Sequence, residues 1–152
     1  MANLLILMGS ESDRKYFDGI DRLAEYFGLT YEFAVLSAHR NSEQLRQRLA
    51  AARTDGTRII IAAAGMAAHL AGACAAESVL PVIGVPLPGS SLGGLDSLLS
   101  TAQMPSGVPV ATMALGKHGA HNAVILAARI LGLSDPRIRQ KLEEFRERGA
   151  CL

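Results

Sequence analysis

The feature that most constrains the fold is a series of short apolar runs without alternating polar positions. Asn3–Met8 reads Asn-Leu-Leu-Ile-Leu-Met, and Arg58–Ala63 and Leu80–Val85 are also almost wholly apolar. Strands that are buried on both faces have this pattern, and such strands belong to parallel sheets that helices cover on both sides. The runs therefore predict strands of a parallel sheet.

Segments with helical spacing of apolar residues lie between these runs. Asp13–Phe27 is one such segment and is followed by Gly28, a good C-cap, and Ser42–Arg53 is another, with Ser42 as its N-cap. A loop is expected at Gly116–Gly119. The other expected elements are strands at Thr30–Leu36 and Val108–Ala114 and helices at Ala67–Glu77, Leu95–Ala102, His121–Leu131 and from Asp135-Pro136 to about Arg148.

Strands that alternate with helices predict an α/β fold with a flavodoxin-like, doubly wound parallel sheet of five strands and a C-terminal helix. Repeats, low-complexity tracts and linkers are lacking, so residues 1–152 are expected to form a single domain. Ligands of such sheets bind outside the carboxyl ends of the strands. Three loops fall at these ends: Gly9–Asp13, Ser37–Arg40 and Ala64–Leu70.

Composition excludes several classes of function. The net charge of +1 gives no basic face for a nucleic acid, and no apolar run reaches the roughly 20 residues that span a bilayer. The start of the chain has no signal-peptide pattern, and Cys74 is expected to be a buried thiol rather than half of a metal-type pair. These features favour a reducing cytoplasm. A hydrophobic content of 49% with only 5% aromatic residues also hints at an oligomer.

The first loop reads Gly-Ser-Glu-Ser-Asp. Gly9 allows close approach of a ligand, and Ser10 and Ser12 offer hydroxyl and N–H groups at a helix N-terminus, where an anion is favoured. Asp13 would be unfavourable beside a phosphate, so we expect it to accept hydrogen bonds from ribose hydroxyls. The alternative is simple capping by Ser12 or Asp13.

The second loop, Ser37-Ala38-His39-Arg40, combines a hydroxyl, an imidazole and a fixed cation. Arginine suits bidentate recognition of phosphate, and histidine exchanges a proton near neutral pH. The alternative is a capping serine with a His–Arg pair on the surface.

The third loop contains Gly65, Ala67 and Ala68, whose small size allows a flat ligand to approach the backbone. A glycine next to a helix N-terminus can also present N–H groups to a carboxylate. His69 taken alone indicates a structural histidine, and His118 and His121 indicate solvated or capping groups. The four histidines lack metal-ligand spacing, so no metal is expected.

Several further motifs occur in a fixed order with the three loops. Together they resemble the N5-carboxyaminoimidazole ribonucleotide mutase family of class I type, also called the catalytic subunit of phosphoribosylaminoimidazole carboxylase. The resemblance covers about Leu4 to Leu131. Its motifs are Gly-Ser-x-Ser-Asp, Ser-Ala-His-Arg, Ala-Ala-His-Leu, Leu-Pro-Val-Ile-Gly-Val-Pro, Gly-Leu-Asp-Ser-Leu-Leu-Ser, Gln-Met-Pro-x-Gly-Val-Pro-Val-Ala-Thr and Asn-Ala-x-x-Leu-Ala-Ala.

The resemblance implies a three-layer α/β/α sandwich that assembles as a homo-octamer, with its sites at subunit junctions. It implies an isomerase of de novo purine biosynthesis that works after a separate ATP-dependent synthetase. This enzyme moves a carboxylate from the exocyclic nitrogen of its nucleotide substrate to ring carbon C4, without a metal or organic cofactor.

The resemblance also implies roles for individual residues. Ser10, Ser12, Ser37 and Arg40 would hold the 5′-phosphate, with Gly9 and Ala38 beside them, and Asp13 would hold the ribose. His39 would be the general acid/base. The loop Gly65–Leu70, with Ala67, Ala68 and Leu70, would hold the base and the migrating carboxylate, with His69 as a second catalytic histidine.

Chemical reasoning agrees, because loss of carbon dioxide and its recapture by C4 need a small apolar cage, which Ala67 and Ala68 fit. Two positions depart from the family, since Met66 replaces a glycine and Ala71 a proline. A required positive φ would strain Met66, and we expect instead a related loop conformation.

Two other functions stay open. One is direct carboxylation of aminoimidazole ribonucleotide by carbon dioxide, whose family members commonly carry lysine in place of Arg40 and lack Ala-Ala-His-Leu. The other is a non-catalytic flavodoxin-like binding module, which the scarcity of aromatic residues disfavours as a flavin site.

Overall fold

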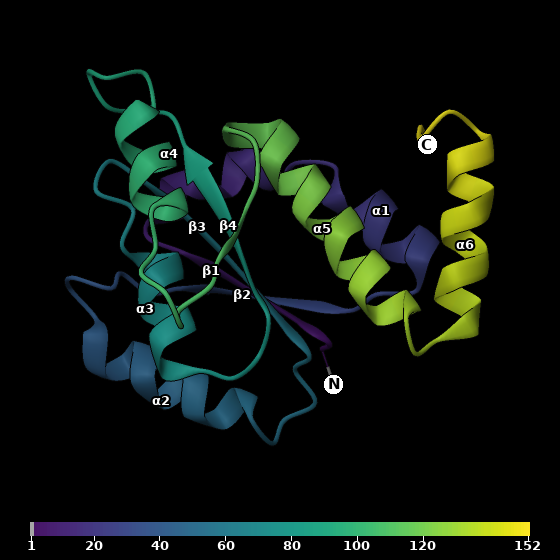
Figure 1. Ribbon diagram of the computed structural model, residues 1–152, viewed down its shortest axis with the longest axis horizontal. Coiled ribbons are helices and arrows are strands. Elements are labelled where there is room, and N and C mark those ends of the chain that lie inside the picture. Colours follow the sequence, from purple (N-terminus) through teal and green to yellow (C-terminus); the bar gives the residue numbers. More distant parts are fainter. Residues whose placement is uncertain (1) are drawn as a thin grey trace.

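A computed structural model describes residues 2–152. Its centre is a parallel five-stranded sheet in the order β2-β1-β3-β4-β5, which confirms the predicted fold class (Figure 1). The strands are β1 Leu4–Met8, β2 Tyr31–Val35, β3 Ile59–Gly65, β4 Val82–Leu87 and β5 Ala111–Thr112.

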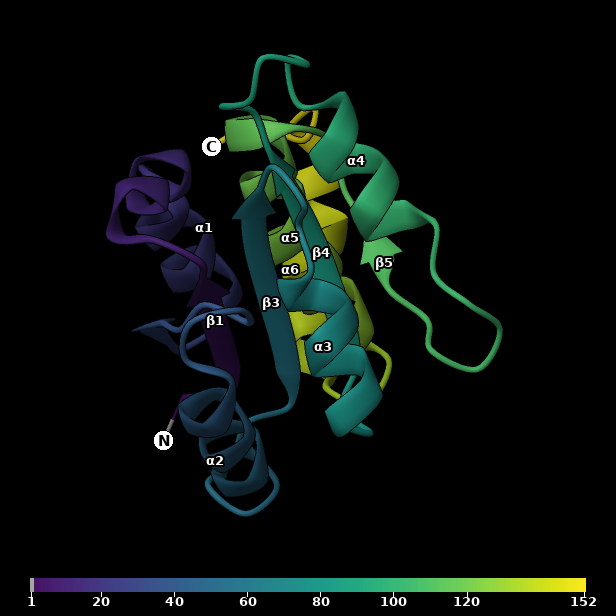
Figure 2. The same cartoon turned by 90° about the vertical axis from the view of Figure 1, so that its left-hand side faces the viewer.

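Helices cover both faces of the sheet and give three layers. One face carries α1 (Ile20–Phe27) and α5 (Gly116–Gly132), and α6 (Pro136–Glu147) packs outside these two helices. The other face carries α2 (Ser42–Ala52), α3 (Leu70–Glu77) and α4 (Leu95–Ala102), as Figure 2 shows in side view. None of the helices in residues 2–152 is long and apolar enough to cross a bilayer.

The central strand β1 explains why the apolar runs do not alternate. Leu4, Ile6 and Met8 face the core beneath α1 and α5, whereas Leu5 and Leu7 face the core beneath α2 and α3. All five side chains are fully buried. Because side chains of a strand point alternately to its two faces, a strand between two cores needs apolar residues at every position.

The helix expected over Asp13–Phe27 is divided in two. A 3₁₀ helix, η1, covers Glu11–Phe17, and α1 begins after Gly19, whose φ of 91° lies in the left-handed region. Glycine adopts this conformation without the clash of a Cβ atom, and Gly19 is the N-cap at which α1 begins after η1 has ended at its C-cap, Asp18. Gly28 is the C-cap as predicted, with φ of 67°.

Other boundaries also differ from the expectations. Asn41, not Ser42, is the N-cap of α2, and α3 starts at Leu70 rather than Ala67. Strand β5 has two residues instead of the seven of Val108–Ala114. The expected loop Gly116–Gly119 is the first turn of α5.

Gly119, in the first turn of α5, serves packing rather than flexibility. A Cβ atom on Gly119 would lie 1.7 Å from the carbonyl oxygen of Ala114, so the helix approaches the preceding backbone more closely than any other residue would allow. Sequence alone does not distinguish such a contact from a glycine-rich loop.

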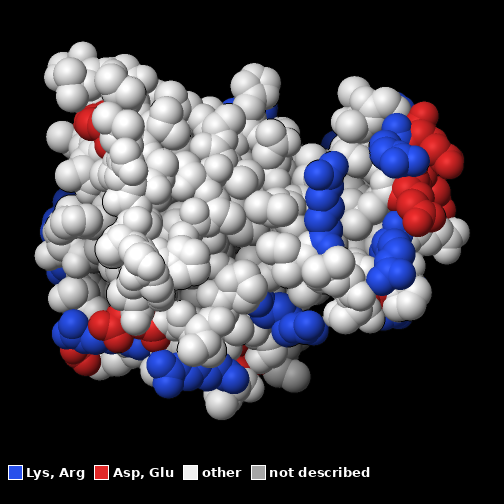
Figure 3. Space-filling model, in the orientation of Figure 1, with Lys and Arg blue, Asp and Glu red and all other residues white. Residues whose placement is uncertain are grey.

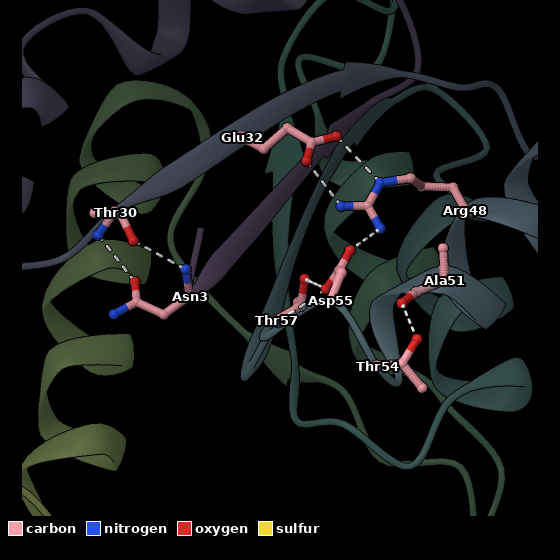
Figure 4. A network of polar contacts seen from close by, with 8 residues as sticks. All are labelled: Asn3, Thr30, Glu32, Arg48, Ala51, Thr54, Asp55 and Thr57. Atoms are coloured by element: carbon pink, nitrogen blue, oxygen red, sulfur yellow. Dashed lines mark hydrogen bonds and ion pairs between the residues drawn. The ribbon is translucent and has the colours of Figure 1, made fainter. Parts of the chain in front are cut away.

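A polar network fastens β2 to α2 at the edge of the sheet (Figure 4). The guanidinium of Arg48, only 16% exposed, donates to both carboxylate oxygens of Glu32 at 3.1 and 3.0 Å and to Asp55 at 2.9 Å. Nearby, Asn3 and Thr30 exchange hydrogen bonds, with Asn3 N–H donating to Thr30 Oγ1 at 3.1 Å and Thr30 N–H donating to Asn3 Oδ1 at 2.9 Å. Bidentate geometry makes the Arg48–Glu32 pair directional as well as attractive.

Cys74 is fully buried in the core beneath α2 and α3, as predicted. Burial raises the pKa of its thiol to about 12, because the thiolate would lose its hydration. The group is therefore a small apolar packing residue at neutral pH.

Candidate active site

The carboxyl ends of β1, β2 and β3 open into one cavity of about 730 Å³. These three strands are neighbours in the sheet, so their loops lie side by side as the strand pattern predicts. Every predicted site residue except Ala68 lines the cavity: Gly9, Ser10, Ser12, Asp13, Ser37, Ala38, His39, Arg40, Gly65, Ala67, His69 and Leu70.

The loop after β1 is held by a capping box. Ser10 Oγ accepts from the backbone N–H of Ser12 at 3.4 Å, and Asp13 Oδ2 accepts from the N–H of Ser10 at 3.0 Å. The hydroxyl oxygens of Ser10 and Ser12 lie 2.9 Å apart. The N-cap residue is therefore Ser10 rather than Ser12, and the Asp13 side chain completes the capping box as its N3 residue. Capping brings the two hydroxyls together at the cavity.

The Asp13 carboxyl is partly buried, and this burial raises its pKa above the usual value. The Ser10 N–H and the positive charge of Lys15 oppose the shift but do not cancel it. A partly desolvated carboxylate that already accepts one backbone hydrogen bond retains acceptor capacity for hydroxyl donors.

The loop after β2 is a tight turn around Ser37. Ser37 Oγ accepts from the backbone N–H of Arg40 at 3.3 Å, and Asn41 N–H donates to the Ser37 carbonyl at 2.8 Å. The Arg40 guanidinium makes no ion pair with any residue in 2–152. An exposed guanidinium at a cavity wall without a carboxylate partner is a ready site for an anion.

His39 and His69 come together although 30 residues separate them in the chain. His39 Nε2 lies 2.8 Å from His69 Nδ1, and the ring centroids are 4.9 Å apart. One nitrogen donates the proton and the other accepts it, so the two imidazoles share one hydrogen-bonded proton. The structure thus places His69 in a hydrogen-bonded pair rather than in the isolated setting suggested by its sequence alone.

The loop after β3 differs from the expected conformation at Met66. Its φ of 56° is left-handed, so the expectation that a methionine would avoid positive φ is wrong. The backbone there is fixed by short turns, because Ala68 N–H donates to the Met66 carbonyl at 2.9 Å and His69 N–H to the Ala67 carbonyl at 2.7 Å. Ala71, in contrast, lies in the first turn of α3, where alanine and proline are both accommodated.

Ala68 supports the site from behind the cavity wall. Its side chain is buried, and its N–H also donates to Ser100 Oγ of α4 at 3.0 Å. The loop after β3 is thereby attached to α4, and Ala68 acts through loop position rather than as a lining residue.

Sequence reasoning missed several lining residues, among them Lys15, Tyr16, Pro88 and Gly89. Tyr16 OH donates to the Pro88 carbonyl at 3.2 Å, which joins η1 to the segment after β4. Lys15 adds a second cation, with its ammonium 5.3 Å from the centroid of the Tyr16 ring. Lys15 lies two residues after Asp13 in the 3₁₀ helix η1, and the sequence signals for this segment predicted an ordinary helix instead.

The other two histidines lie outside this cavity, beside a hollow of about 370 Å³ between α1 and α5. His121 Nε2 donates to the Asp18 carbonyl at 2.9 Å and so braces the bend between η1 and α1. Within residues 2–152, no group of three or more His, Cys, Asp or Glu side chains could hold a metal ion.

A doubly wound parallel sheet with a cavity at its strand ends defines a flavodoxin-like α/β protein. The chain belongs to the AIR carboxylase family, whose model matches residues 3–150.

The chain is 49% identical over 141 residues to N5-carboxyaminoimidazole ribonucleotide mutase of Pseudomonas aeruginosa, covering 93% of this chain and 86% of that protein. The enzyme of the same name from Saccharolobus solfataricus is 48% identical over 147 residues, which are 97% of this chain and 92% of that protein. The crystal structure of Treponema denticola PurE is similar with a TM-score of 0.86 and 31% identity, covering 97% of this chain and 90% of that chain.

Proposed function

We propose that this chain is an isomerase of de novo purine biosynthesis that converts N5-carboxyaminoimidazole ribonucleotide into 4-carboxyaminoimidazole ribonucleotide. The main support is that three loops, two of them joined by the His39–His69 pair, line one cavity in a chain 48–49% identical to proteins named for this reaction. The test is an incubation of the purified protein with the N-carboxylated substrate. Turnover is measured as loss of this substrate and appearance of the C4 acid.

The polar half of the cavity suits a phosphoribosyl group. We assign the 5′-phosphate to the hydroxyls of Ser10, Ser12 and Ser37 and to the guanidinium of Arg40. Ser10 and Ser12 already lie 2.9 Å apart, and the Arg40 guanidinium makes no ion pair among the described residues. Asp13 would accept hydrogen bonds from the ribose hydroxyls. Lys15, on the same wall, would add a second positive charge.

The histidine pair suits the proton steps of the reaction. When the N–C bond breaks, the exocyclic nitrogen must gain a proton, and after C4 has attacked carbon dioxide a proton must leave C4. His39 would donate the first proton and accept the second, so that one imidazole ends the cycle unchanged. His69, bonded to His39 Nε2, would orient the ring and exchange the shared proton.

The apolar half of the cavity suits the imidazole base and the carbon dioxide. Ala38, Ala64, Ala67 and Leu70 line it. Gly65 also lines it and has no side chain that would keep a ligand away from the backbone. The proposed chemistry requires neither a metal nor an organic cofactor, because each step is a proton transfer or a carboxylate transfer. Holding the reactants together supplies the main rate advantage.

A second candidate is direct carboxylation of aminoimidazole ribonucleotide by carbon dioxide, since the family description names an AIR carboxylase. Arg40 and the Ala-Ala-His-Leu sequence favour the mutase within the family. Separate incubations with the N-carboxylated substrate and with aminoimidazole ribonucleotide plus bicarbonate distinguish the two. Turnover of the second mixture alone would establish the carboxylase instead.

We further propose that the chain assembles as a homo-octamer. Leu92, Leu95 and Leu99 are 64, 55 and 49% exposed. Leu95 and Leu99 lie one turn apart on α4, and Leu92 lies in the turn before this helix, which is hydrogen-bonded to the cavity loop through Ser100. Figure 3 shows a broad uncharged surface over this part of the molecule, with charges gathered over α6 and along the α2 edge. Large exposed apolar patches of this kind mark protein interfaces.

Light scattering should report an octamer, and Leu95→Lys with Leu99→Lys should lower the mass and the activity together. A monomer at micromolar concentration would contradict the assembly. We place the enzyme in the cytoplasm. We also place it downstream of an ATP-dependent synthetase, because an N-carboxylated amine must be formed by an activating enzyme before it can be rearranged.

A further inference from the structure

Met66 has a backbone conformation that methionine rarely adopts. Its φ of 56° forces the Cβ atom toward the backbone, a conformation that glycine adopts freely. Its side chain is 65% exposed, so packing within the subunit returns little of that cost. Strained residues of this kind concentrate at functional sites, where the surrounding structure holds them in place.

The structure holds the Met66 backbone firmly at the edge of the cavity. Its carbonyl oxygen accepts from Ala68 N–H at 2.9 Å, and the same N–H donates to Ser100 Oγ at 3.0 Å. Ser100 Oγ in turn donates to the Asp96 carbonyl at 2.8 Å within α4. A flexible thioether side chain therefore projects from an anchored backbone.

The surroundings of Met66 show what this side chain can cover. Met66 lines the cavity and precedes Ala67 in the chain, and Ala38, Ala64 and both histidines of the His39–His69 pair line the same cavity. Among the described lining residues, it is the one apolar side chain longer than alanine that is mostly exposed. The other long apolar residue of this loop, Leu70, is buried in the core.

We infer that Met66 is a positioning residue that covers the apolar half of the cavity and retains carbon dioxide between the two bond-making steps. This inference rests on the proposed function. When the N–C bond breaks, its electron pair stays on the exocyclic nitrogen, which takes a proton from His39. C4 then forms a C–C bond to the same carbon dioxide, and the C4 proton returns to His39.

Carbon dioxide needs such a cover because it is neutral and apolar. Arg40 and the serine hydroxyls bind anions through charge and hydrogen bonds, which act only weakly on this molecule. A wall that excludes water is what keeps it beside C4. Methionine suits this task because its unbranched, polarisable side chain fills irregular gaps against a flat ring.

The test follows a labelled carboxylate. Substrate with a ¹³C carboxylate is converted in unlabelled bicarbonate buffer with carbonic anhydrase, which rapidly exchanges any carbon dioxide that escapes. The wild-type protein should keep most of the label at C4. Met66→Gly should lose at least half of it and release free aminoimidazole ribonucleotide, whereas Met66→Leu should keep the label.

Two controls separate this effect from folding. Val79→Gly removes another exposed apolar side chain, 92% exposed, and should retain the label as wild type does. Val79 precedes the amino end of β4, whereas the cavity lies at the carboxyl ends of the strands. Met66→Gly should unfold at the same or a higher temperature than wild type, because glycine relieves the left-handed backbone.

Wild-type label retention by Met66→Gly, or equal loss by Met66→Leu, would overturn the inference. Turnover by the wild-type protein with complete exchange of the label would also overturn it, while leaving the proposed function intact. No turnover of the N-carboxylated substrate by the wild-type protein would remove both.

Discussion

The His39–His69 pair permits a quantitative test of which imidazole exchanges protons with the substrate. His39→Asn keeps a polar side chain at the cavity but removes the group that gives and takes a proton. General acid–base catalysis contributes about 10²–10⁴-fold in rate. A single imidazole serves both proton steps in the proposed reaction, so His39→Asn should lower kcat by at least the lower end of this range, about 3 kcal/mol of transition-state stabilisation.

His69→Asn is the matched variant and should behave differently. If His69 orients His39, the variant loses the 2.8 Å hydrogen bond between the rings, while His39 still transfers protons to and from the substrate. A hydrogen bond of this kind contributes about 0.5–1.5 kcal/mol, which corresponds to a loss of roughly 2- to 12-fold in kcat. The double variant should then be no slower than His39→Asn alone, because the orienting group acts only through His39.

The assay measures kcat and KM for the N-carboxylated substrate and, separately, binding of aminoimidazole ribonucleotide by calorimetry. His39→Asn should bind the nucleotide within a few-fold of wild type, because His39 is assigned no contact with the phosphate. Near-normal turnover by His39→Asn would refute the acid/base assignment. A loss in His69→Asn equal to that in His39→Asn would refute the assignment of an orienting role to His69.

Three further predictions concern the phosphate site, the buried carboxyl and the fold. Arg40→Ala should raise KM about 10- to 150-fold with little change in kcat, because a charge-assisted hydrogen bond of about 1.5–3 kcal/mol is lost equally from ground and transition states; an unchanged KM would count against the clamp. Asp13→Asn should raise the urea denaturation midpoint at pH 7, because the raised pKa of Asp13 means that ionisation of its carboxyl destabilises the folded state. The difference in midpoint between variant and wild type should shrink as the pH falls toward the ordinary aspartate pKa. Equal midpoints at pH 7 would contradict this prediction. Gly119→Ala should lower the free energy of unfolding by about 3 kcal/mol or more, since its Cβ would lie 1.7 Å from the Ala114 carbonyl oxygen, and a normal urea midpoint would contradict the close packing.

The sheet and its helices were predictable because the sequence signals for them are strong. The all-apolar β1 and β3 match strands that lie between two cores, and the apolar spacing of α2 matches its buried residues Leu45, Leu49 and Ala52. The failures fall where glycine has more than one use. Gly19 separates η1 from α1, although the apolar spacing of Asp13–Phe27 predicts one helix. Gly119 allows close packing inside a helix, although its surroundings predict a loop.

The candidate site was predictable as a set of loops but not as a set of contacts. Strand ends of a parallel sheet must share an edge, so Ser10, His39 and His69 were expected near one another. The 2.8 Å contact between the two histidines depends on side-chain directions that the sequence does not specify. Lys15 was missed because its place at the cavity depends on the 3₁₀ geometry of η1.

The order of strands in the sheet has a consequence for how the chain tolerates change. The neighbours β2, β1 and β3 all come from the first half of the sequence, and every cavity-lining residue except Pro88 and Gly89 precedes residue 71. The second half supplies the braces, namely α4 behind the third loop and α5 behind η1. Substitutions in the second half should therefore act first on stability and assembly and affect the reaction only through them, whereas substitutions in the first half change the cavity lining itself.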